Sequence, residues 1–281
     1  QSMPDHVYWL EREGRRRQPV LYSAPIEVAP ILRNVLFGTL RTVILTSATL
    51  AVAGRLDYCR DRLGAPAETE LLCLGSPFDH ARQMRLYVAT NAPDPKEKDA
   101  YAEAVAKGVL QWSLKTKGRA FALFTSAELL QRTAEALREP LADAGLELLA
   151  QGGKLGRRAM LETFRKNEGY VLFGLDSFWM GVDVRGDALS NVILTRLPFA
   201  VPDHPVVAAR LQRIKERRGD PFREYSLPEA VLKFRQGFGR LIRSQTDQGI
   251  VVVLDSRLLT KWYGRVFKRS LPECPVETFE L

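Results

Sequence analysis

Residues 226–244 read SLPEAVLKFRQGFGRLIRS and predict an amphipathic helix with a phosphate-binding face. Gln236, Arg240 and Arg243 follow one another at i, i+4 and i+7, so a continuous helix would project all three from one side. Two guanidinium groups one turn apart suit a polyphosphate, because each offers planar, paired donors that keep their charge. A basic surface helix facing water is the alternative interpretation.

The two ends of this segment carry further signals. Ser226 and Glu229 fit the capping box with which many helices begin. Gly237 and Gly239 each cost a helix about 1 kcal/mol relative to Ala. Two glycines beside two arginines therefore indicate that another backbone or a ligand comes close.

The composition limits the class of protein. A chain of 281 residues, 46% of them hydrophobic, has room for one large domain or two medium domains. No apolar run approaches the roughly 20 residues that span a bilayer, so no membrane partner is expected. Cys59, Cys73 and Cys274 lie far apart and form neither a disulfide framework nor a metal-ligand spacing, which favours a cytoplasmic setting with no metal in this chain.

Positive charge gathers in one part of the chain. The formal net charge is +8, and residues 210–243 hold ten basic and four acidic side chains. A polyanionic partner is the natural inference from this stretch, and a solvated basic face is the alternative.

Short apolar runs alternate with helical patterns along the chain. This alternation predicts an α/β fold with a parallel, doubly wound sheet. The first 18 residues indicate a strand edge or linker. Strands are expected at 43–45, 84–90, 119–124, 146–152, 170–175, 191–195 and 250–255, and helices at 26–37, 55–63, 99–115, 125–138, 155–166 and 226–244.

Small hydroxyl residues follow two of the expected strands. Ser47 and Thr49 come after the first strand, and Thr125 and Ser126 come after the third. Ligands of open α/β sheets bind at the carboxyl ends of the strands, which makes these residues candidates for phosphate contacts. The alternatives are a simple turn for Ser47 and Thr49, and a helix cap made by Thr125 with Glu128.

A long loop separates the strands at 170–175 and 191–195. Loops of this length between buried strands usually carry function. Ser177 and Trp179 are candidate nucleic-acid contacts, with Trp179 either a base-stacking platform or, as its residue type favours, part of the core. Asp183, two residues after Gly181, could orient an arginine or a ribose hydroxyl, or could belong to a plain turn.

Four segments follow one another along the chain: TSATL at 46–50, FTS at 124–126, FWMGVDVRGDAL at 178–189 and QGFGRLIRS at 236–244. In this order they resemble motifs III to VI of superfamily-two helicases, and most closely the DinG/XPD branch. Further segments similar to that branch are LTRLPFAVPDHP at 194–205 and VVLDSR at 252–257.

The sequence lacks two other motifs of that family. It contains no G-x-x-x-x-G-K-[ST] phosphate loop and no Asp-Glu-x-His box. The resemblance places both in a first RecA-like lobe, which can also carry an iron–sulfur cluster in the longer protein. The chain is therefore expected to be a piece of such a helicase: residues 1–80 would end lobe one, and 81–281 would form the second RecA-like lobe.

The resemblance implies nucleotide roles for the residues that match its last two motifs. Arg240 and Arg243 would reach the γ-phosphate of ATP as arginine fingers, together with Gln236. Gly181 and Asp183 would link the nucleotide to DNA. Met180 and Arg185 depart from the family pattern, which usually has Glu and Pro at those positions. The departures put any carboxylate role at position 180 in doubt and could alter the loop's contact with DNA.

The two earlier motifs imply contacts with DNA and coupling. Thr125 and Ser126 would touch the DNA backbone, and Ser47 and Thr49 would couple hydrolysis to movement of the lobes. The implied activity is ATP-driven 5′ to 3′ translocation on single-stranded DNA, as in DNA repair. The Mg²⁺ that accompanies ATP would be held mainly by the first lobe of the same polypeptide, and the protein would act as a monomer.

This chain alone is expected neither to hydrolyse ATP nor to unwind a duplex, because its arginines have no phosphate loop to face. Two other classes stay open. One is a non-catalytic nucleic-acid-binding module with a helicase-like fold. The other is a small-molecule α/β enzyme with a phosphate site, which would show no salt-dependent binding of single-stranded DNA.

Overall fold

The computed structural model describes residues 3, 5–13, 18–179 and 188–281. The chain divides into two compact units. The N-terminal unit comprises Gln1–Leu74 and Phe199–Leu232, and the C-terminal unit comprises Gly75–Pro198 and Lys233–Leu281. The sequence analysis put its boundary near residue 80 and did not anticipate that a later segment joins the N-terminal unit.

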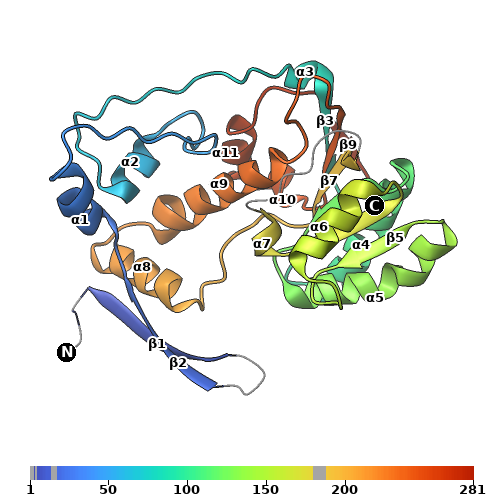
Figure 1. The fold of residues 1–281 in the computed structure, drawn as a ribbon, viewed down its shortest axis with the longest axis horizontal. Coiled ribbons are helices and arrows are strands. Elements are labelled where there is room, and N and C mark those ends of the chain that lie inside the picture. The colour runs from blue at the N-terminus through green and yellow to red at the C-terminus, as the bar shows by residue number, and fades with distance from the viewer. Residues whose placement is uncertain (1–2, 4, 14–17, 180–187) are drawn as a thin grey trace. The chain divides into compact units, whose positions relative to one another are not determined.

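The C-terminal unit is built on a seven-stranded sheet in the order β5-β6-β4-β7-β8-β3-β9 (Figure 1). Every pairing in it is parallel, as the alternation of strands and helices predicts. Its strands are β3 (Met84–Ala89), β4 (Ala120–Leu123), β5 (Glu147–Ala150), β6 (Tyr170–Gly174), β7 (Asn191–Leu194), β8 (Gly249–Val253) and β9 (Val276–Phe279).

Two long helices, α4 (Lys98–Lys115) and α5 (Ala127–Asp143), cover one face of this sheet (Figure 1). Side chains of a strand point alternately to its two faces, so Ala120 and Ala122 of β4 face these helices. The core between them is continuous and apolar. It includes Val105, Val109, Leu130, Leu137, Leu141, Val171, Phe173, Ile193, Val252 and Leu254.

The opposite side chains of β4 meet another group of helices. Phe121 packs edge-on against Phe178, with ring centroids 5.8 Å apart. A Cβ atom on Gly174 would lie 2.5 Å from the Cβ of Phe178, so only glycine lets this contact form. The remaining helices of this unit are α3 (His80–Gln83), α6 (Arg157–Lys166), α7 (Asp176–Trp179), α10 (Arg257–Thr260) and α11 (Gly264–Arg269).

The N-terminal unit contains an antiparallel hairpin of β1 (His6–Glu13) and β2 (Gln18–Pro25), which the sequence indicated only as a strand edge or linker. Trp9 and Tyr22 stack within it, with ring centroids 5.2 Å apart. The unit also holds α1 (Ala29–Leu32), the π-helix η1 (Arg33–Phe37), α2 (Asp57–Leu63), α8 (Pro205–Glu216) and the π-helix η3 (Phe222–Ser226).

The strand expected at residues 43–45 is absent, and that prediction is wrong for this structure. Ile44 is 84% exposed and Leu45 is also exposed. A buried parallel strand needs a hydrogen-bonded neighbour on each side, and no strand in the described part of the N-terminal unit pairs with this run.

The arginine-rich helix is shorter than predicted. It is α9 (Leu227–Phe238), and it continues from η3 without a break, so Ser226 does not cap it. Glu229 accepts a hydrogen bond from the hydroxyl of Tyr58 instead of completing a capping box. Beyond Phe238, the carboxylate of Asp247 accepts from two successive backbone N–H groups, those of residues 243 and 244, and so replaces the bonds of a longer helix.

Candidate functional site

The polar residues after β4 lie at the carboxyl edge of the sheet. Ser126 is the N-cap of α5, and its hydroxyl accepts from the backbone N–H of Leu129 at 3.4 Å. The predicted capping box with Thr125 as the cap is therefore wrong by one residue. Both hydroxyls are only partly buried, and the Ser126 O–H can still donate while its oxygen caps the helix.

Ser177 is exposed in the first turn of α7, after the neighbouring strand β6. Gln151, at the end of β5, donates from Nε2 to its Oγ at 3.2 Å. The Oε1 of the same amide accepts from the backbone N–H of Leu175 at 2.8 Å. Gln151 therefore joins the ends of two strands and orients Ser177. The sequence analysis missed it, although a Gln followed by two glycines after a strand was a usable signal.

Trp179 is not a base-stacking platform, and this candidate role is corrected. Its ring is 0% exposed, so neither face is free for a base. The indole Nε1–H donates to the carbonyl of Phe124 at 3.1 Å, immediately before Thr125. The ammonium of Lys233 lies 5.5 Å from the ring centroid and is paired with Asp176 at 2.6 Å.

Gly237 explains why the end of α9 can lie against this ring. A Cβ there would come within 2.8 Å of Cζ3 of Trp179 and 3.0 Å of Cδ2 of Leu194. The close approach inferred from the glycine is therefore made by side chains of the same unit, and the inference that another backbone or a ligand requires it is wrong at this position. The glycine serves the packing of α9 on the strand layer.

Arg240 lies just beyond the helix and is 9% exposed. Its Nε donates to the backbone carbonyl of Trp179 at 3.1 Å, and its Nη2 donates to the same oxygen. A guanidinium held in this way is fixed in direction, because two donors share one acceptor.

Gln236 and Arg243 do not share a helix face with Arg240. Gln236 is in the last turn of α9, whereas both arginines follow the end of the helix. Arg243 is half-buried, and its Nε is 3.4 Å from the carbonyl of Arg240. The candidate residues Gly181 and Asp183 lie outside the described residues, as do Met180 and Arg185.

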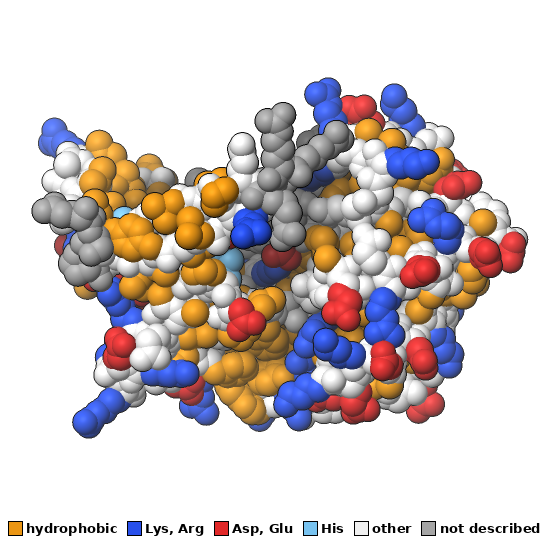
Figure 2. Space-filling view, turned by 90° about the horizontal axis from the view of Figure 1, so that it is seen from below, with side chains coloured by type: hydrophobic (Ala, Val, Ile, Leu, Met, Phe, Trp, Pro, Cys, Tyr) orange, Lys and Arg blue, Asp and Glu red, His pale blue; other side chains and the backbone are white. Residues whose placement is uncertain are grey.

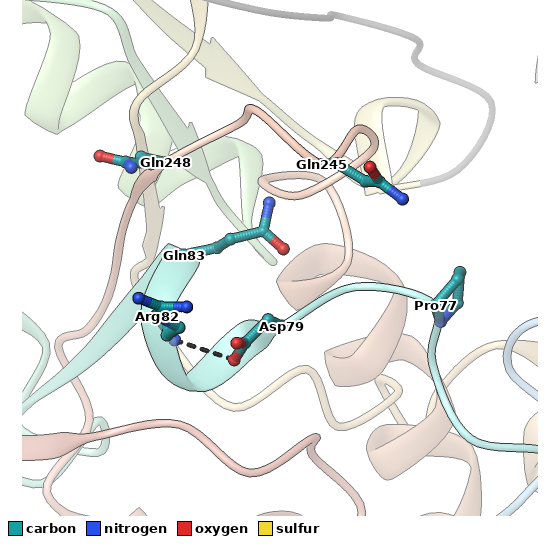
Figure 3. Close-up of a pocket in the computed structure, with 6 residues that line it drawn as sticks. All are labelled: Pro77, Asp79, Arg82, Gln83, Gln245 and Gln248. Atoms are coloured by element: carbon teal, nitrogen blue, oxygen red, sulfur yellow. Dashed lines mark hydrogen bonds between the residues drawn. The ribbon is translucent and has the colours of Figure 1, made fainter.

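A polar hollow of about 420 Å³ lies at the amino ends of β3 and β8 (Figure 3). One of its lining residues, Gln245, follows Arg243 by two positions in the chain. Gln83 spans it and donates to the carbonyls of Ser244 and Asp247 at 2.8 and 2.9 Å. This clamp fixes the turn that follows Arg243. The lining residues are Pro77, Asp79, Arg82, Gln83, Gln245 and Gln248.

Ser47 and Thr49 lie in an irregular segment of the N-terminal unit. The backbone N–H of Thr49 donates to the hydroxyl of Ser47 at 3.3 Å, as in the turn that the sequence left open as an alternative.

Much of the basic stretch is paired inside its own unit. Arg210 donates to the carbonyl of Ile26 at 2.7 Å and to the hydroxyl of Tyr225 at 3.1 Å. On the face drawn in Figure 2, basic and acidic side chains are interspersed. The polyanion inference from charge alone is thus weakened, because several of its cations have protein partners. These pairs are Arg213–Asp5, Arg217–Glu224, Arg223–Asp220 and Lys233–Asp176.

A buried ion pair closes the end of β8, and the sequence analysis gave it no role. Asp255 is fully buried and accepts from Arg257 at 2.6 and 2.9 Å and from the backbone N–H of Leu197 at 2.9 Å. Burial by itself would lower the pKa of Arg257, but the hydrogen bonds and charge of Asp255 raise it above its usual value. The charge order Asp-Ser-Arg after a buried strand was the available signal.

The described residues contain no group of His, Cys, Asp and Glu that could hold a metal ion. Within the same part of the chain, no helix has the length and apolarity to cross a membrane.

Comparison with known proteins adds findings on sequence and on structure. Residues 109–274 match a family described as the helicase C-terminal domain. The chain is 34% identical over 283 residues to "3'-5' exonuclease DinG" of Bacillus subtilis, covering 98% of this chain and 30% of that protein. It is 39% identical over 267 residues to "ATP-dependent DNA helicase YoaA" of Haemophilus influenzae, covering 95% and 40% respectively.

The chain is also 37% identical to "ATP-dependent helicase DinG" of Mycobacterium tuberculosis, covering 96% of this chain and 41% of that protein. It thus spans well under half the length of these relatives. The solved structure "XPD_APO" has a TM-score of 0.69 at 16% identity, over 94% of this chain and 53% of that chain. The solved structure "XPD_Helicase" has a TM-score of 0.68, also at 16% identity, over 93% and 47%. These likenesses confirm the predicted fold class, a RecA-like parallel sheet flanked by helices.

Proposed function

The chain belongs to the family of helicase C-terminal domains, and from that premise we propose that it is the C-terminal part of a DinG/XPD-like, ATP-dependent DNA helicase. The full protein would couple ATP hydrolysis to translocation on single-stranded DNA and to duplex unwinding. The observation that carries the proposal is the direct bond between two motif segments: the Arg240 guanidinium is held by the carbonyl of Trp179. This bond joins the segment at 236–244, which would contact the nucleotide, to Trp179 of the segment at 178–189, which would link the nucleotide to DNA.

On the nucleotide side, Arg243 is our primary candidate for contact with the γ-phosphate of ATP. Arg240 is buried against Trp179 and would stabilise the transition state from there or by a change of partner. Gln236, Gly181 and Asp183 would complete this side. Most of the Mg²⁺ coordination would come from the first RecA-like lobe of the same polypeptide.

On the DNA side, Thr125, Ser126 and Ser177 form a row of hydroxyl groups at the carboxyl edge of adjacent strands. Such a row fits the phosphates of a single strand passing over the sheet. Phosphate contacts would dominate the affinity, and binding would weaken steeply with salt.

Exposed apolar side chains in the N-terminal unit support the expectation that residues 1–80 form the end of a first lobe. Ile44 and Leu72 expose apolar side chains in extended segments without strand partners in the described part of the unit. Strands of a preceding sheet would cover them, and Ser47 and Thr49 would then couple that lobe to hydrolysis. The chain alone, without a phosphate loop, would turn over no ATP.

The test compares this chain with the full-length protein. Fluorescence anisotropy with an oligothymidine should show that both bind single-stranded DNA, with affinity falling steeply between 50 and 200 mM salt, as expected for several phosphate contacts. Only the full-length protein should hydrolyse ATP. ATP turnover by the 281-residue chain would refute the assignment of an incomplete site.

Arg243→Ala gives the decisive variant. It should leave the chain folded and abolish ATP hydrolysis in the full-length protein, whereas Arg85→Ala, which removes an exposed arginine paired with Glu277, should leave hydrolysis intact. Retained hydrolysis in the Arg243 variant would contradict the arginine-finger role. A full-length protein that binds DNA but never hydrolyses ATP would instead be a non-catalytic binding module.

A further inference from the structure

Trp179 is bonded at its two ends to different functional segments. Its side-chain Nε1–H donates to the carbonyl of Phe124, the residue that precedes Thr125 and Ser126. Its backbone carbonyl accepts from the guanidinium of Arg240. One residue therefore connects the end of β4 with the arginine segment that follows α9.

The connection is rigid because the ring cannot move on its own. The ring is fully buried, and the close approach of Gly237 leaves no room on that side. Packed interiors transmit displacements, since a side chain in a filled site has few alternative positions. A shift of the Arg240 guanidinium would thus move the Trp179 carbonyl and, through the indole, the end of β4.

Packing alone does not explain the indole N–H. Trp112 is also a core residue of this unit, and its Nε1 is buried without a hydrogen-bond partner among the described residues. The fold therefore accommodates a buried indole whose N–H is unused, whereas the N–H of Trp179 is aimed at the carbonyl that precedes the two hydroxyl residues.

We propose that Trp179 is a positioning residue that couples nucleotide binding to DNA binding, by transmitting the position of Arg240 to Thr125 and Ser126. This role rests on the proposed function, because it requires a nucleotide at the arginines and DNA at the hydroxyls. Linkage makes the coupling reciprocal: a nucleotide that changes the affinity for DNA by some factor has its own affinity changed by DNA by the same factor.

The test measures that factor in the full-length protein. The Kd for a fluorescent oligothymidine is determined with and without adenylyl imidodiphosphate and Mg²⁺, and the ratio of the two values is the coupling. Trp179→Phe keeps an aromatic ring and the backbone carbonyl but removes the Nε1–H bond. The variant should reduce the effect of the nucleotide on the Kd for DNA about fivefold, so that the ratio moves toward one. This is the factor that one ordinary hydrogen bond contributes.

Trp112→Phe is the matched control. It makes the same change of ring at another core position of the same unit and removes an N–H that has no partner among the described residues, so the ratio should stay at the wild-type value. A melting temperature for each variant separates stability from coupling. A purely structural Trp179 would lower the melting temperature of its variant and leave the ratio unchanged, which would overturn the proposal.

A second variant removes the bond without changing shape. Benzothienylalanine at position 179 replaces the ring N–H by sulfur and keeps the bicyclic ring, so a folding defect is avoided. It should move the ratio toward one as Trp179→Phe does, and a wild-type ratio here would also overturn the proposal. A wild-type protein that binds no single-stranded DNA would refute the proposed function itself, which is a different result.

Discussion

Asp255→Ala should destabilise the C-terminal unit far more than an ordinary loss of an ion pair. The Asp255 side chain is 1% exposed and that of Arg257 is 16% exposed, so water cannot replace the lost carboxylate freely. The variant takes the Asp255 counter-ion from a largely buried guanidinium, and it takes the carboxylate acceptor from the backbone N–H of Leu197. Breaking a buried pair from one side costs about 3–5 kcal/mol.

The assay is urea unfolding followed by circular dichroism, with the free energy of unfolding compared between variants. Arg158→Ala is the control, because its Nε also lies 2.9 Å from a carboxylate oxygen, that of Glu162, but this pair lies at the surface. An exposed i, i+4 pair contributes about 0.3–0.5 kcal/mol. The difference in burial should therefore give costs that differ about tenfold.

A double variant tests the cause. Combining Asp255→Ala with Arg257→Met removes the uncompensated charge and should recover a large part of the lost stability. A cost below about 1 kcal/mol for the single variant, or no recovery in the double variant, would contradict the view that a buried unpaired charge is responsible.

Three further predictions concern the packing at Gly237, the reactivity of two cysteines and the orientation of Ser177 by Gln151. Gly237→Ala should lower the free energy of unfolding by about 1 kcal/mol, because overpacking against the buried ring exceeds the gain in helix propensity. Gly75→Ala, with open space around it, should not destabilise in the same assay. Maleimide should label the exposed Cys73 well before Cys59 at pH 8. Burial and the charge of Glu229 raise the pKa of the Cys59 thiol, which reduces the fraction of reactive thiolate. Mass spectrometry reports the order of labelling, and equal rates would disprove the prediction. Gln151→Ala should weaken binding of an oligothymidine by this chain about fivefold through the loss of one bond to Ser177, and unchanged anisotropy curves would count against that contact.

The parallel sheet could be predicted because its central strands are continuous apolar runs. Every residue of β7 is buried, and a run of this kind, bounded by polar turns, is typical of a parallel strand covered on both faces. The run at 43–45 has the same composition yet forms no strand. The apolar composition of a run predicts that its side chains need to be buried. It does not specify whether neighbouring strands are present to pair with the run.

The site was less predictable than the fold because its positions depend on distant partners. Helical spacing put Gln236, Arg240 and Arg243 on one face, but Asp247 captures the backbone and ends the helix earlier. Residue type left Trp179 as either core or base platform. Only the tertiary structure shows the carbonyl of Phe124 that its indole N–H reaches.

The order of strands in the sheet has a consequence for how the chain folds. Of the seven strands of the sheet, β3 comes earliest in the chain, whereas its two neighbours in the sheet, β8 and β9, come last. Met84 pairs with Gly249, and Leu86 pairs with Val276. Pairings of such long range carry a large loop-closure entropy and form slowly. During synthesis β4, β5 and β6 can associate early, whereas β3 leaves the ribosome long before either partner exists. Its apolar residues then need protection by a chaperone or by temporary non-native contacts. A chain truncated before residue 249 would leave β3 as an unpaired, aggregation-prone strand.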